Sequence, residues 1–480
     1  MNGILNKLRQ SEAFDKENRI SYVKAIVMMG MFTFIFLGAE YLYVNMISRS
    51  VSGNKAVMAQ NYALGISALG FLLHPVFCRF CKDRLCSACM VITTAASFLC
   101  IFFLCRHISY SVTFAFGLLL FLFLGFFGSA VFYKSMCLLE NDKYLARLVG
   151  ISYMIGVLLQ FVNNNIIRSE IIEAVILSVF LAALVWLLIK SKPVNENAAA
   201  VTGEKEDGGN SEKSSKGRVL GLLLILLVVL MTCIFSTLDN AVTLSHAAGA
   251  MDIGQWPRIF LAFSGLIAGF VFDINSRKVM SFIMYCVMLL STICIAVFEF
   301  AGPFLIGLII FYMSAGFFAV FFTTAFMEFA RYTRIPELWA GLGRAVNNIT
   351  AAAITGGSLA LLSSGNSIAA ITIVLILFVT VSFVTALYTY KHKAFMDEML
   401  ASDIMTMDDH ERLQVFSKEY SLTARETEVF GLLVNTEDTL QVIAENLYIS
   451  RRTLERYISA IYEKTGVKSR IGLIRIYNEK

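Results

Sequence analysis

Long apolar runs fill most of this chain, and a short amphipathic segment ends it. Stretches of about 20 apolar residues, long enough to cross a bilayer as a helix, recur twelve times. We predict membrane helices over residues 22–47, 56–78, 87–105, 110–133, 146–166, 171–189, 219–239, 256–272, 279–298, 302–326, 337–362 and 368–389. The predicted fold class is therefore all-α: a polytopic membrane bundle of twelve helices in two sets of six, followed by a small four-helix domain.

Polar segments separate these parts. The stretch between the two sets of six helices is rich in Asn, Ala, Gly, Ser, Glu and Lys without apolar periodicity, which is typical of a solvated linker. The predicted organisation is an N-terminal segment (1–21), a first membrane half (22–189), a linker (190–218), a second membrane half (219–389), a connector (390–417) and a C-terminal domain (418–480).

Composition agrees with a membrane protein, since 57% of the residues are hydrophobic and only 16% are charged, and the mean hydropathy is +0.70. The net charge of +5 says little, but the places of the basic residues say more. Loops and segments on the side of the N-terminus carry 21 Lys and Arg, against five on the opposite side. By the positive-inside rule, we expect both termini to be cytoplasmic and the protein to be a multi-pass protein of the inner membrane.

The last sixty residues have a different pattern. Thr423 and Glu426 have the spacing of a capping box at the start of an amphipathic helix. A second short helix and the turn before Ser450 lead into a third helix, whose buried face is predicted to contain Leu454 and Ile458. Two short helices, a tight turn and a third helix form a helix-turn-helix unit.

The third helix carries the chemistry for binding DNA, because six basic residues lie between residues 451 and 470 against two acidic ones. The Ser450 hydroxyl and the first N–H groups, with Arg451 and Arg452, are placed to meet phosphates, and Arg456 to reach a base edge. The predicted DNA-binding set is Ser450, Arg451, Arg452, Thr453, Glu455, Arg456, Lys464 and Lys468. The alternative is a basic three-helix domain that binds only protein.

These helices resemble the LuxR-type helix-turn-helix of bacterial regulators, with matches in every helix: Leu422-Thr423-x-Arg425-Glu426-x-Glu428-Val429, Ile443-Ala444-x-x-Leu447-x-Ile449-Ser450-x-x-Thr453-Leu454 and Ile461-x-x-Lys464-x-Gly466-Val467-x-x-Arg470. The chain departs from the family at Glu455, usually Lys, and at Tyr457, usually His. The resemblance implies double-stranded DNA as a partner, RNA polymerase if the protein is an activator, and a homodimer formed through the last helix, with Leu473, Ile474 and Tyr477 exposed for pairing.

The membrane part carries a second resemblance. The run Gly269-x-x-x-Asp273-x-x-x-Arg277-Lys278 is similar to a loop of the major facilitator superfamily, whose twelve helices are built as six plus six. Asp83-Arg84 is the equivalent in the first half, where Arg79 replaces the glycine. The resemblance implies the facilitator fold, while the function remains open.

Ionisable residues inside membrane helices are candidate sites, because each costs on the order of 3 kcal/mol to insert. Glu40 and Asp239 occupy equivalent helices of the two halves. The predicted ligand-binding set is Glu40, Asp239, Arg344, Asn347, Asn348, Gln160 and Asn163, because the resemblance puts their helices around a central cavity. The alternative is that Glu40 lies at the outer interface and that the amides only join helices.

Other chemistry is not expected. The cysteine run Cys78, Cys81, Cys86 and Cys89 is too closely spaced for a zinc ribbon, so we predict no metal site and no cofactor. The sequence contains no phosphate-binding glycine loop and no nucleophile elbow, so we predict no enzyme.

The leading hypothesis is a membrane-bound one-component regulator, in which a small molecule binds the membrane domain and the connector passes the change to the DNA-binding domain. The connector is either a lever or a plain tether. The alternative functions are a secondary transporter, possibly proton-coupled through Glu40 and Asp239, with an autoregulatory tail, and a membrane anchor without a ligand.

Overall fold

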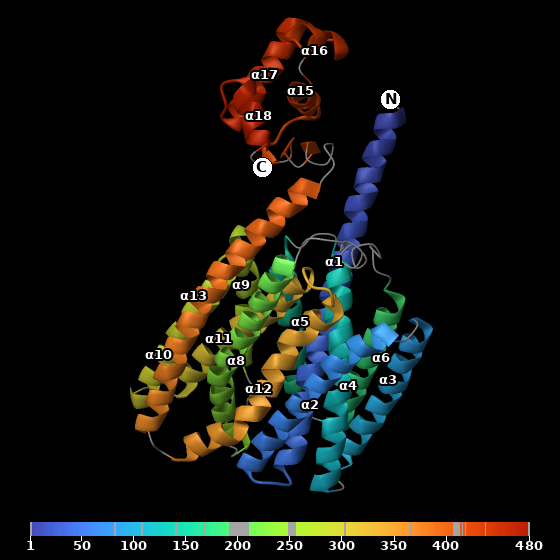
Figure 1. The fold of residues 1–480 in the computed structure, drawn as a ribbon. Coiled ribbons are helices and arrows are strands. Elements are labelled where there is room, and N and C mark those ends of the chain that lie inside the picture. The colour runs from blue at the N-terminus through green and yellow to red at the C-terminus, as the bar shows by residue number, and fades with distance from the viewer. Residues whose placement is uncertain are drawn as a thin grey trace. The chain divides into compact units, whose positions relative to one another are not determined.

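Membrane-length helices dominate the structure, which is a computed structural model (Figure 1). It describes residues 2–80, 83–106, 109–139, 143–167, 169–191, 211–247, 256–301, 304–364, 367–406 and 413–478, apart from residues 415, 418 and 437. Within these ranges every regular element is helical, which confirms the predicted all-α class. The chain divides into two compact units, Met1–His392 and Lys393–Lys480.

The first unit contains a helix for each of the twelve predicted membrane segments. The helices are α1 (Asn2–Ser48), α2 (Gly53–Phe80), α3 (Asp83–Cys105), α4 (Tyr110–Cys137), α5 (Leu145–Ile166), α6 (Glu170–Lys190), α8 (Ser211–Ala247), α9 (Arg258–Phe272), α10 (Met280–Ala301), α11 (Phe304–Ala330), α12 (Pro336–Ser364) and α13 (Ser367–Thr406). Among the described residues, ten helices are long and apolar enough to cross a membrane, and α9 and the described part of α10 are shorter apolar helices.

Three helices extend furthest beyond their predicted apolar segments. The helix α1 begins at Asn2, α8 begins at Ser211 inside the predicted linker, and α13 continues to Thr406 through part of the predicted connector. Runs of apolar residues predict the membrane-spanning part of a helix. They do not predict whether the helix continues into the polar residues beside it. Two apolar residues of the predicted connector, Ile404 and Met407, have side chains outside the described part of the chain.

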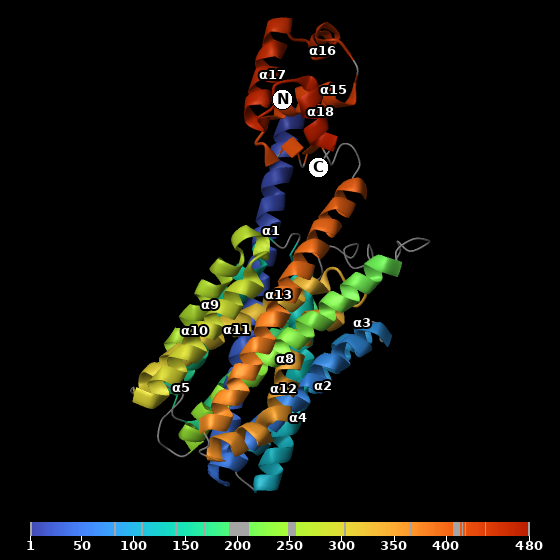
Figure 2. The ribbon, with the colours of Figure 1, turned by 60° about the vertical axis from the view of Figure 1, so that its left-hand side comes forward.

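The two sets of six helices gather on opposite sides of the bundle, with α1 to α6 in blue to green and α8 to α13 in green to orange (Figure 1). Turning the molecule keeps α9, α10 and α11 apart from α2 and α3 (Figure 2). The helix pairs that join the halves most extensively are α2 with α12 and α5 with α9.

Glycines allow the α5–α9 contact. A Cβ atom on Gly150 would lie 2.6 Å from the carbonyl oxygen of Gly265, and a Cβ atom on Gly269 would lie 2.6 Å from the carbonyl oxygen of Ala146. The two backbones therefore touch, as small residues permit in membrane helix pairs. Gly269 thus has a packing role in the facilitator-like motif.

A buried ion network follows this contact. The Asp273 carboxylate accepts hydrogen bonds from the backbone N–H groups of Ala146 (3.1 Å) and Arg147 (2.9 Å) at the start of α5. Arg277 ends the short 3-10 helix η1 (Ile274–Arg277) and pairs with Asp273 at 3.3 Å. It also pairs with Glu328 of α11 at 2.9 Å. The network therefore fixes the N-terminus of α5, in the first half, to three elements of the second half.

The second unit has its own hydrophobic core, formed around α15 (Ala424–Asn435), α16 (Leu440–Asn446), α17 (Arg451–Thr465) and α18 (Arg470–Asn478). The predicted capping box is present, because Thr423 Oγ1 accepts from the Glu426 N–H and Glu426 Oε2 accepts from the Thr423 N–H at 2.6 Å. Leu454 and Ile458 are buried, as predicted. The α17 helix is capped at its C-terminus by Gly466, whose left-handed φ of 74° suits a glycine.

One prediction about α18 is wrong. Leu473 and Tyr477 are not exposed for pairing, since they are 0% and 5% exposed and belong to the domain core. Tyr477 packs edge-on against Phe416 and Phe430. The sequence predicted that the apolar face of α18 contacts a second subunit. In the structure this face completes the hydrophobic core of its own domain. Ile471, on the same helix, is 80% exposed.

The α5–α9 contact gives a testable prediction. Gly150→Ala is expected to lower the free energy of unfolding by about 1–3 kcal/mol, because an added methyl group in a close backbone contact forces the helices apart. Thermal unfolding of the full-length protein in detergent measures the change. The control is Gly356→Ala, because nothing lies within 4 Å of the position of its Cβ atom. Equal stability of the two variants would contradict the close packing.

Candidate functional site

A cavity of ≈ 180 Å³ lies inside the first unit and is lined from both membrane halves. Its walls come from α1, α2 and α5 of the first half and from α8, α9, α11 and α12 of the second. Aromatic side chains form much of the wall and include Phe36, Tyr153, Phe235, Tyr312 and Phe322. Such a mixture of apolar walls and a few polar groups is typical of a small-molecule site.

Two acidic and two basic side chains line this cavity: Glu40 on α1, Asp239 on α8, Arg258 on α9 and Arg344 on α12. The Gln60 amide donates a hydrogen bond of 2.7 Å to Glu40 Oε1. Two acids and two guanidinium groups therefore share one cavity, where an ionic group of a ligand finds either sign of charge.

Each of the two guanidinium groups has a buried nitrogen without a hydrogen bond among the described residues. Arg344 lies between the rings of Phe36 and Phe322, 5.4 Å and 5.3 Å from their centroids. The Nε atoms of Arg344 and Arg258 are buried and have no hydrogen-bond partner among the described residues. Buried unpaired donors are costly, so both arginines are positioned to gain from an anionic ligand group.

Amides beside the cavity join the two halves. Asn61 of α2 donates to Asn240 Oδ1 of α8 at 2.8 Å, and Asn240 in turn donates to Ser358 of α12 at 2.6 Å. Asn348 of α12 donates to the Ser67 hydroxyl of α2 at 2.9 Å. The walls of the cavity are therefore linked across the contact between the halves.

The structure brings most of the predicted ligand set together. Glu40, Asp239, Arg344, Asn347 and Asn348 all line the cavity. Gln160 and Asn163 are not among the described lining residues, and each has a partner in the helix packing. The Gln160 amide donates to the Leu37 carbonyl at 2.9 Å, and the Asn163 amide donates to Glu173 at 3.4 Å. These two predicted residues are therefore placed in helix contacts.

Sequence reasoning missed Arg258. It lies at the start of the predicted segment 256–272 but was not included in the predicted ligand-binding set, whereas in the structure it is the first residue of α9 and is only 9% exposed. The Pro257 immediately before it marks a helix start, which was the available signal. Gln60 and Asn61 were also missed, because the predicted polar set was taken from other helices.

The second candidate site is the N-terminal end of α17. Ser450 caps this helix, since its hydroxyl accepts a hydrogen bond of 3.2 Å from the Thr453 N–H. Arg451, Arg452 and Arg456 are exposed on the helix that follows. Arg451 pairs with Glu455 at 3.1 Å, and the Arg456 guanidinium lies over the Tyr457 ring at 5.7 Å. The exposed arginines at the start of a helix form a cationic surface.

Two basic residues further along have partners within the domain. Lys464 donates to Glu426 at 2.6 Å and to the Ser421 carbonyl at 3.0 Å, so this member of the predicted DNA-binding set joins α17 to the start of α15. Arg470 donates to three carbonyl oxygens of the α15–α16 region, with Leu433 and Asp438 at 2.8 Å and Thr436 as the third. Lys468 is exposed.

The Lys464 contact has an electrostatic consequence. Burial opposes ionisation of the Glu426 carboxyl, but the Lys464 ammonium and the hydrogen bonds from Thr423 outweigh it. The pKa of Glu426 is therefore held below its ordinary value. The capping box and this ion pair share one carboxylate and act together.

Comparison with known proteins matches each part separately. Residues 420–477 match the family described as bacterial regulatory proteins, luxR family. The spore germination protein GerE of Bacillus subtilis (strain 168) is 44% identical over 55 residues, which are 12% of this chain and 73% of that protein.

The membrane part is similar to solved transporter structures. The human organic anion transporter MFSD10 (TETRAN) is 12% identical with a TM-score of 0.50, and the alignment covers 78% of this chain and 99% of that chain. The fucose:proton symporter FucP of E. coli is 11% identical with a TM-score of 0.50, and covers the same shares. At these identities the likeness shows the fold alone.

The chain is therefore a multi-pass membrane protein in which a domain of the major facilitator fold is fused to a LuxR-type helix-turn-helix DNA-binding domain. Through this C-terminal domain the chain belongs to the luxR family of bacterial regulatory proteins. Proteins of both classes are in general not enzymes.

Glu426 gives a prediction about pH. Because its pKa is lowered in the folded state, its contribution to stability is complete above the ordinary value of 4.5 and is lost as the pH falls through the lower folded value. Glu426→Gln should cost about 1–2 kcal/mol at neutral pH and remove this dependence. Chemical unfolding of a fragment of residues 408–480 across acidic pH measures both. Glu428→Gln is the control, since Glu428 is exposed and should leave both unchanged.

Proposed function

We propose that this protein is a membrane-bound one-component transcription regulator, in which a small molecule in the cavity controls sequence-specific DNA binding by the C-terminal domain. One observation carries the proposal: a cavity lined by two acidic and two basic side chains, with two buried guanidinium nitrogens that lack partners among the described residues, and a DNA-binding domain are parts of the same chain. A transporter alone has no use for a DNA-binding domain, and a regulator alone has no use for a charged membrane cavity.

The basic residues support an orientation for this function. Their excess in the loops on the side of the N-terminus favours cytoplasmic termini in the inner membrane. In this orientation, the cationic start of α17 can reach the chromosome. Binding as a homodimer, and contact with RNA polymerase if the protein activates transcription, belong to the same proposal.

The charges of the cavity point to the chemical class of the ligand. Arginine side chains bind carboxylates through paired hydrogen bonds, and Arg258 and Arg344 have buried Nε atoms without partners among the described residues. Glu40 and Asp239 complement an ammonium group in the same space. The proposed ligand is therefore a small zwitterion with a carboxylate and an ammonium group, such as a free amino acid.

A route from the cavity to α13 is available in the membrane unit. The α9 helix carries Arg258 at its first residue and Asp273 at its C-terminal end. Asp273 leads through Arg277 to Glu328, whose carboxylate lies 4.0 Å from His392 Nε2 of α13. A ligand that moves α9 relative to α5 changes this network. For regulation, the ligand must bind one arrangement more tightly than the other.

A second candidate function is secondary transport with an autoregulatory tail. The observation in its favour is the pair of carboxylates Glu40 and Asp239 in the cavity of a fold that transporters share. Membrane carboxylates of this kind act as proton relays in transporters. The two functions differ in whether the zwitterion is carried across the membrane.

The ligand prediction concerns Arg344 and Glu40. Arg344→Gln and Glu40→Gln should each weaken binding of an amino acid by about ten- to a hundredfold, because each removes a charge-assisted hydrogen bond of about 1.5–3 kcal/mol. Calorimetry of the full-length protein measures the affinity for a panel of amino acids and for carboxylic acids and amines of the same size. The comparison identifies the chemical class of the ligand. Arg106→Gln and Glu173→Gln are matched controls, since neither residue is among those that line the cavity.

Separate outcomes distinguish the functions. Binding of the single-charge compounds as tightly as the amino acids would reject the zwitterion. An amino acid that binds without changing the DNA affinity of the protein in nanodiscs would reject regulation. Accumulation of that amino acid by vesicles, lost in Glu40→Gln, would favour the transporter. Unaltered transcription in Asp239→Asn and Arg344→Gln cells would favour a plain membrane anchor.

The DNA prediction concerns the start of α17. Arg452→Ala and Arg456→Ala should each weaken duplex DNA binding and lower the slope of log affinity against log salt by about one, because each removes a contact that displaces a counterion. Titration of labelled DNA at several salt concentrations measures both quantities.

Arg425→Ala is the matched control. Arg425 is an exposed arginine next to Glu426 in the sequence. Glu426 contacts Lys464, which lies at the C-terminal end of α17, whereas Ser450 lies at its N-terminal end. It should leave affinity and slope nearly unchanged. Full affinity in both α17 variants would mean that another surface of the domain contacts DNA.

A further inference from the structure

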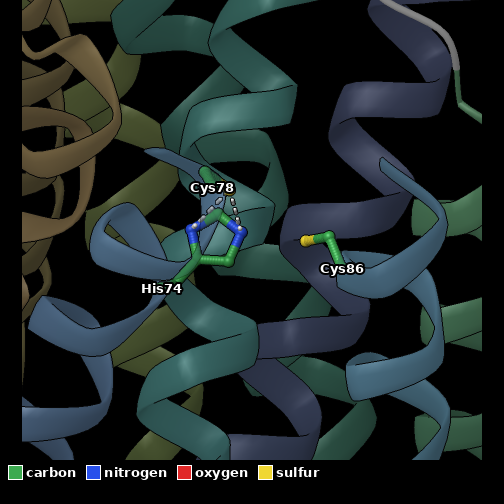
Figure 3. Close-up of side chains that lie close together, drawn as sticks. All are labelled: His74, Cys78 and Cys86. Atoms are coloured by element: carbon green, nitrogen blue, oxygen red, sulfur yellow. Dashed lines mark hydrogen bonds between the residues drawn. The ribbon is translucent and has the colours of Figure 1, made fainter. Parts of the chain in front are cut away.

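Three soft donor groups meet where α2 ends and α3 begins. They are the His74 imidazole and the Cys78 thiol of α2 and the Cys86 thiol of α3, and their ligand atoms all lie within 4.8 Å of one another. Cys78 Sγ lies 3.4 Å from His74 Nε2 and 4.0 Å from Nδ1. Figure 3 shows the Cys86 sulfur directed from the neighbouring helix towards the His74 ring.

The local structure fixes this arrangement. His74 and Cys78 are four residues apart on α2, so they lie on one face of the helix one turn apart. The His74 ring is 1% exposed and packs edge-on against Phe126 of α4, with 5.2 Å between the centroids. Cys86 lies in the first turn of α3, where that helix returns past the end of α2. The imidazole is therefore held in place, and the two thiols come from different elements.

We propose that His74, Cys78 and Cys86 bind a Zn²⁺ ion. Zinc takes thiolate sulfur and imidazole nitrogen as ligands and prefers a tetrahedral arrangement, and the ligand atoms here are already close enough to surround one ion. On binding, the two thiols release two protons, and His74 binds through a neutral imidazole. A water molecule completes the four ligands where a protein supplies three.

Charge favours Zn²⁺ over Cu⁺, which also prefers sulfur ligands. Two thiolates and a neutral imidazole around Zn²⁺ carry no net charge, whereas the same ligands around Cu⁺ leave one negative charge. Burial of an uncompensated charge is costly, and His74 is almost completely buried. The neutral zinc complex therefore suits the site better.

The ion would join two helices that otherwise contact each other little. The α2 helix packs mainly on α4 and α12, and its contact with α3 is slight among the described residues. The same α2 helix supplies Gln60 and Asn61 to the cavity. A zinc ion held by both helices would fix the end of α2 against α3, independently of any ligand in the cavity.

The cysteine spacing alone did not reveal this site. Cys89 faces away, with its sulfur 3.9 Å from the Thr93 hydroxyl, and Cys81 lies outside the described residues. The signal that sequence analysis overlooked is the His-x-x-x-Cys spacing, which places two donors on one helix face.

The test uses the full-length protein in detergent, stripped of metal and dialysed against Zn²⁺ alone. The expected result is one tightly bound zinc per chain, with affinity at least tenfold weaker in Cys78→Ser, Cys86→Ser and His74→Gln. Cys89→Ser is the matched control and should bind as the unaltered protein does. Co²⁺ in place of Zn²⁺ should show the absorption of a tetrahedral thiolate complex.

A second measurement needs no variant. Zn²⁺ should slow the alkylation of Cys78 and Cys86 relative to Cys89 in the unaltered protein, as read by mass spectrometry. Failure of the unaltered protein to bind zinc, or equal alkylation of Cys78 and Cys86 with and without zinc, would overturn the proposal. Undiminished binding by folded Cys78→Ser and Cys86→Ser would do the same, and would mean that Cys78 and His74 form only a hydrogen bond.

Discussion

The Asp273 carboxylate holds the two halves of the membrane unit together. It binds the backbone N–H groups at the start of α5, where the partial positive charge of the helix favours an anion. It also pairs with Arg277, which reaches Glu328 of α11. Asn275, Ser276 and Arg277 all have φ between 50° and 63°, a region that costs non-glycine residues roughly 1–2 kcal/mol each. The ion pairs hold this strained loop in place.

Buried charge is treated differently in the cavity. Around Asp273 each acid meets a guanidinium group or N–H donors within the protein. In the cavity, Glu40 meets only the Gln60 amide at hydrogen-bond distance, and the Arg258 and Arg344 Nε atoms have no such partner among the described residues. A membrane protein retains such groups where they serve a ligand or an ion. The contrast separates a structural network from a candidate binding site within one bundle.

The sequence predicted the helices and the DNA-binding unit because apolar length, capping residues and family motifs are local signals. It predicted Glu40, Asp239 and Arg344 because a charge in an apolar run is conspicuous. It could not place Gln160, which packs on the Leu37 carbonyl, because amides serve helix contacts and cavities equally well. The ligand-binding set predicted from the sequence did not include Arg258, which lies at the start of α9. Leu473 and Tyr477 were predicted to be exposed, whereas both belong to the hydrophobic core of the small domain. These outcomes depend on packing partners far away in the chain.

The strain of a residue in the Asp273 loop and the free energy that a ligand in the cavity can supply are of similar size. Coupling between the loop and the cavity is therefore feasible. A ligand that binds one arrangement of the halves ten- to a hundredfold more tightly shifts the balance by about 1.4–2.8 kcal/mol. Each of the three left-handed residues of the Asp273 loop stores strain of a similar size, which offsets part of the cost of breaking the ion pairs when the loop rearranges. Since Glu328 lies beside both Arg277 and His392 of α13, a change in the loop alters the surroundings of the helix that continues to Thr406. A rigid network without strain would require a much tighter ligand to achieve the same shift.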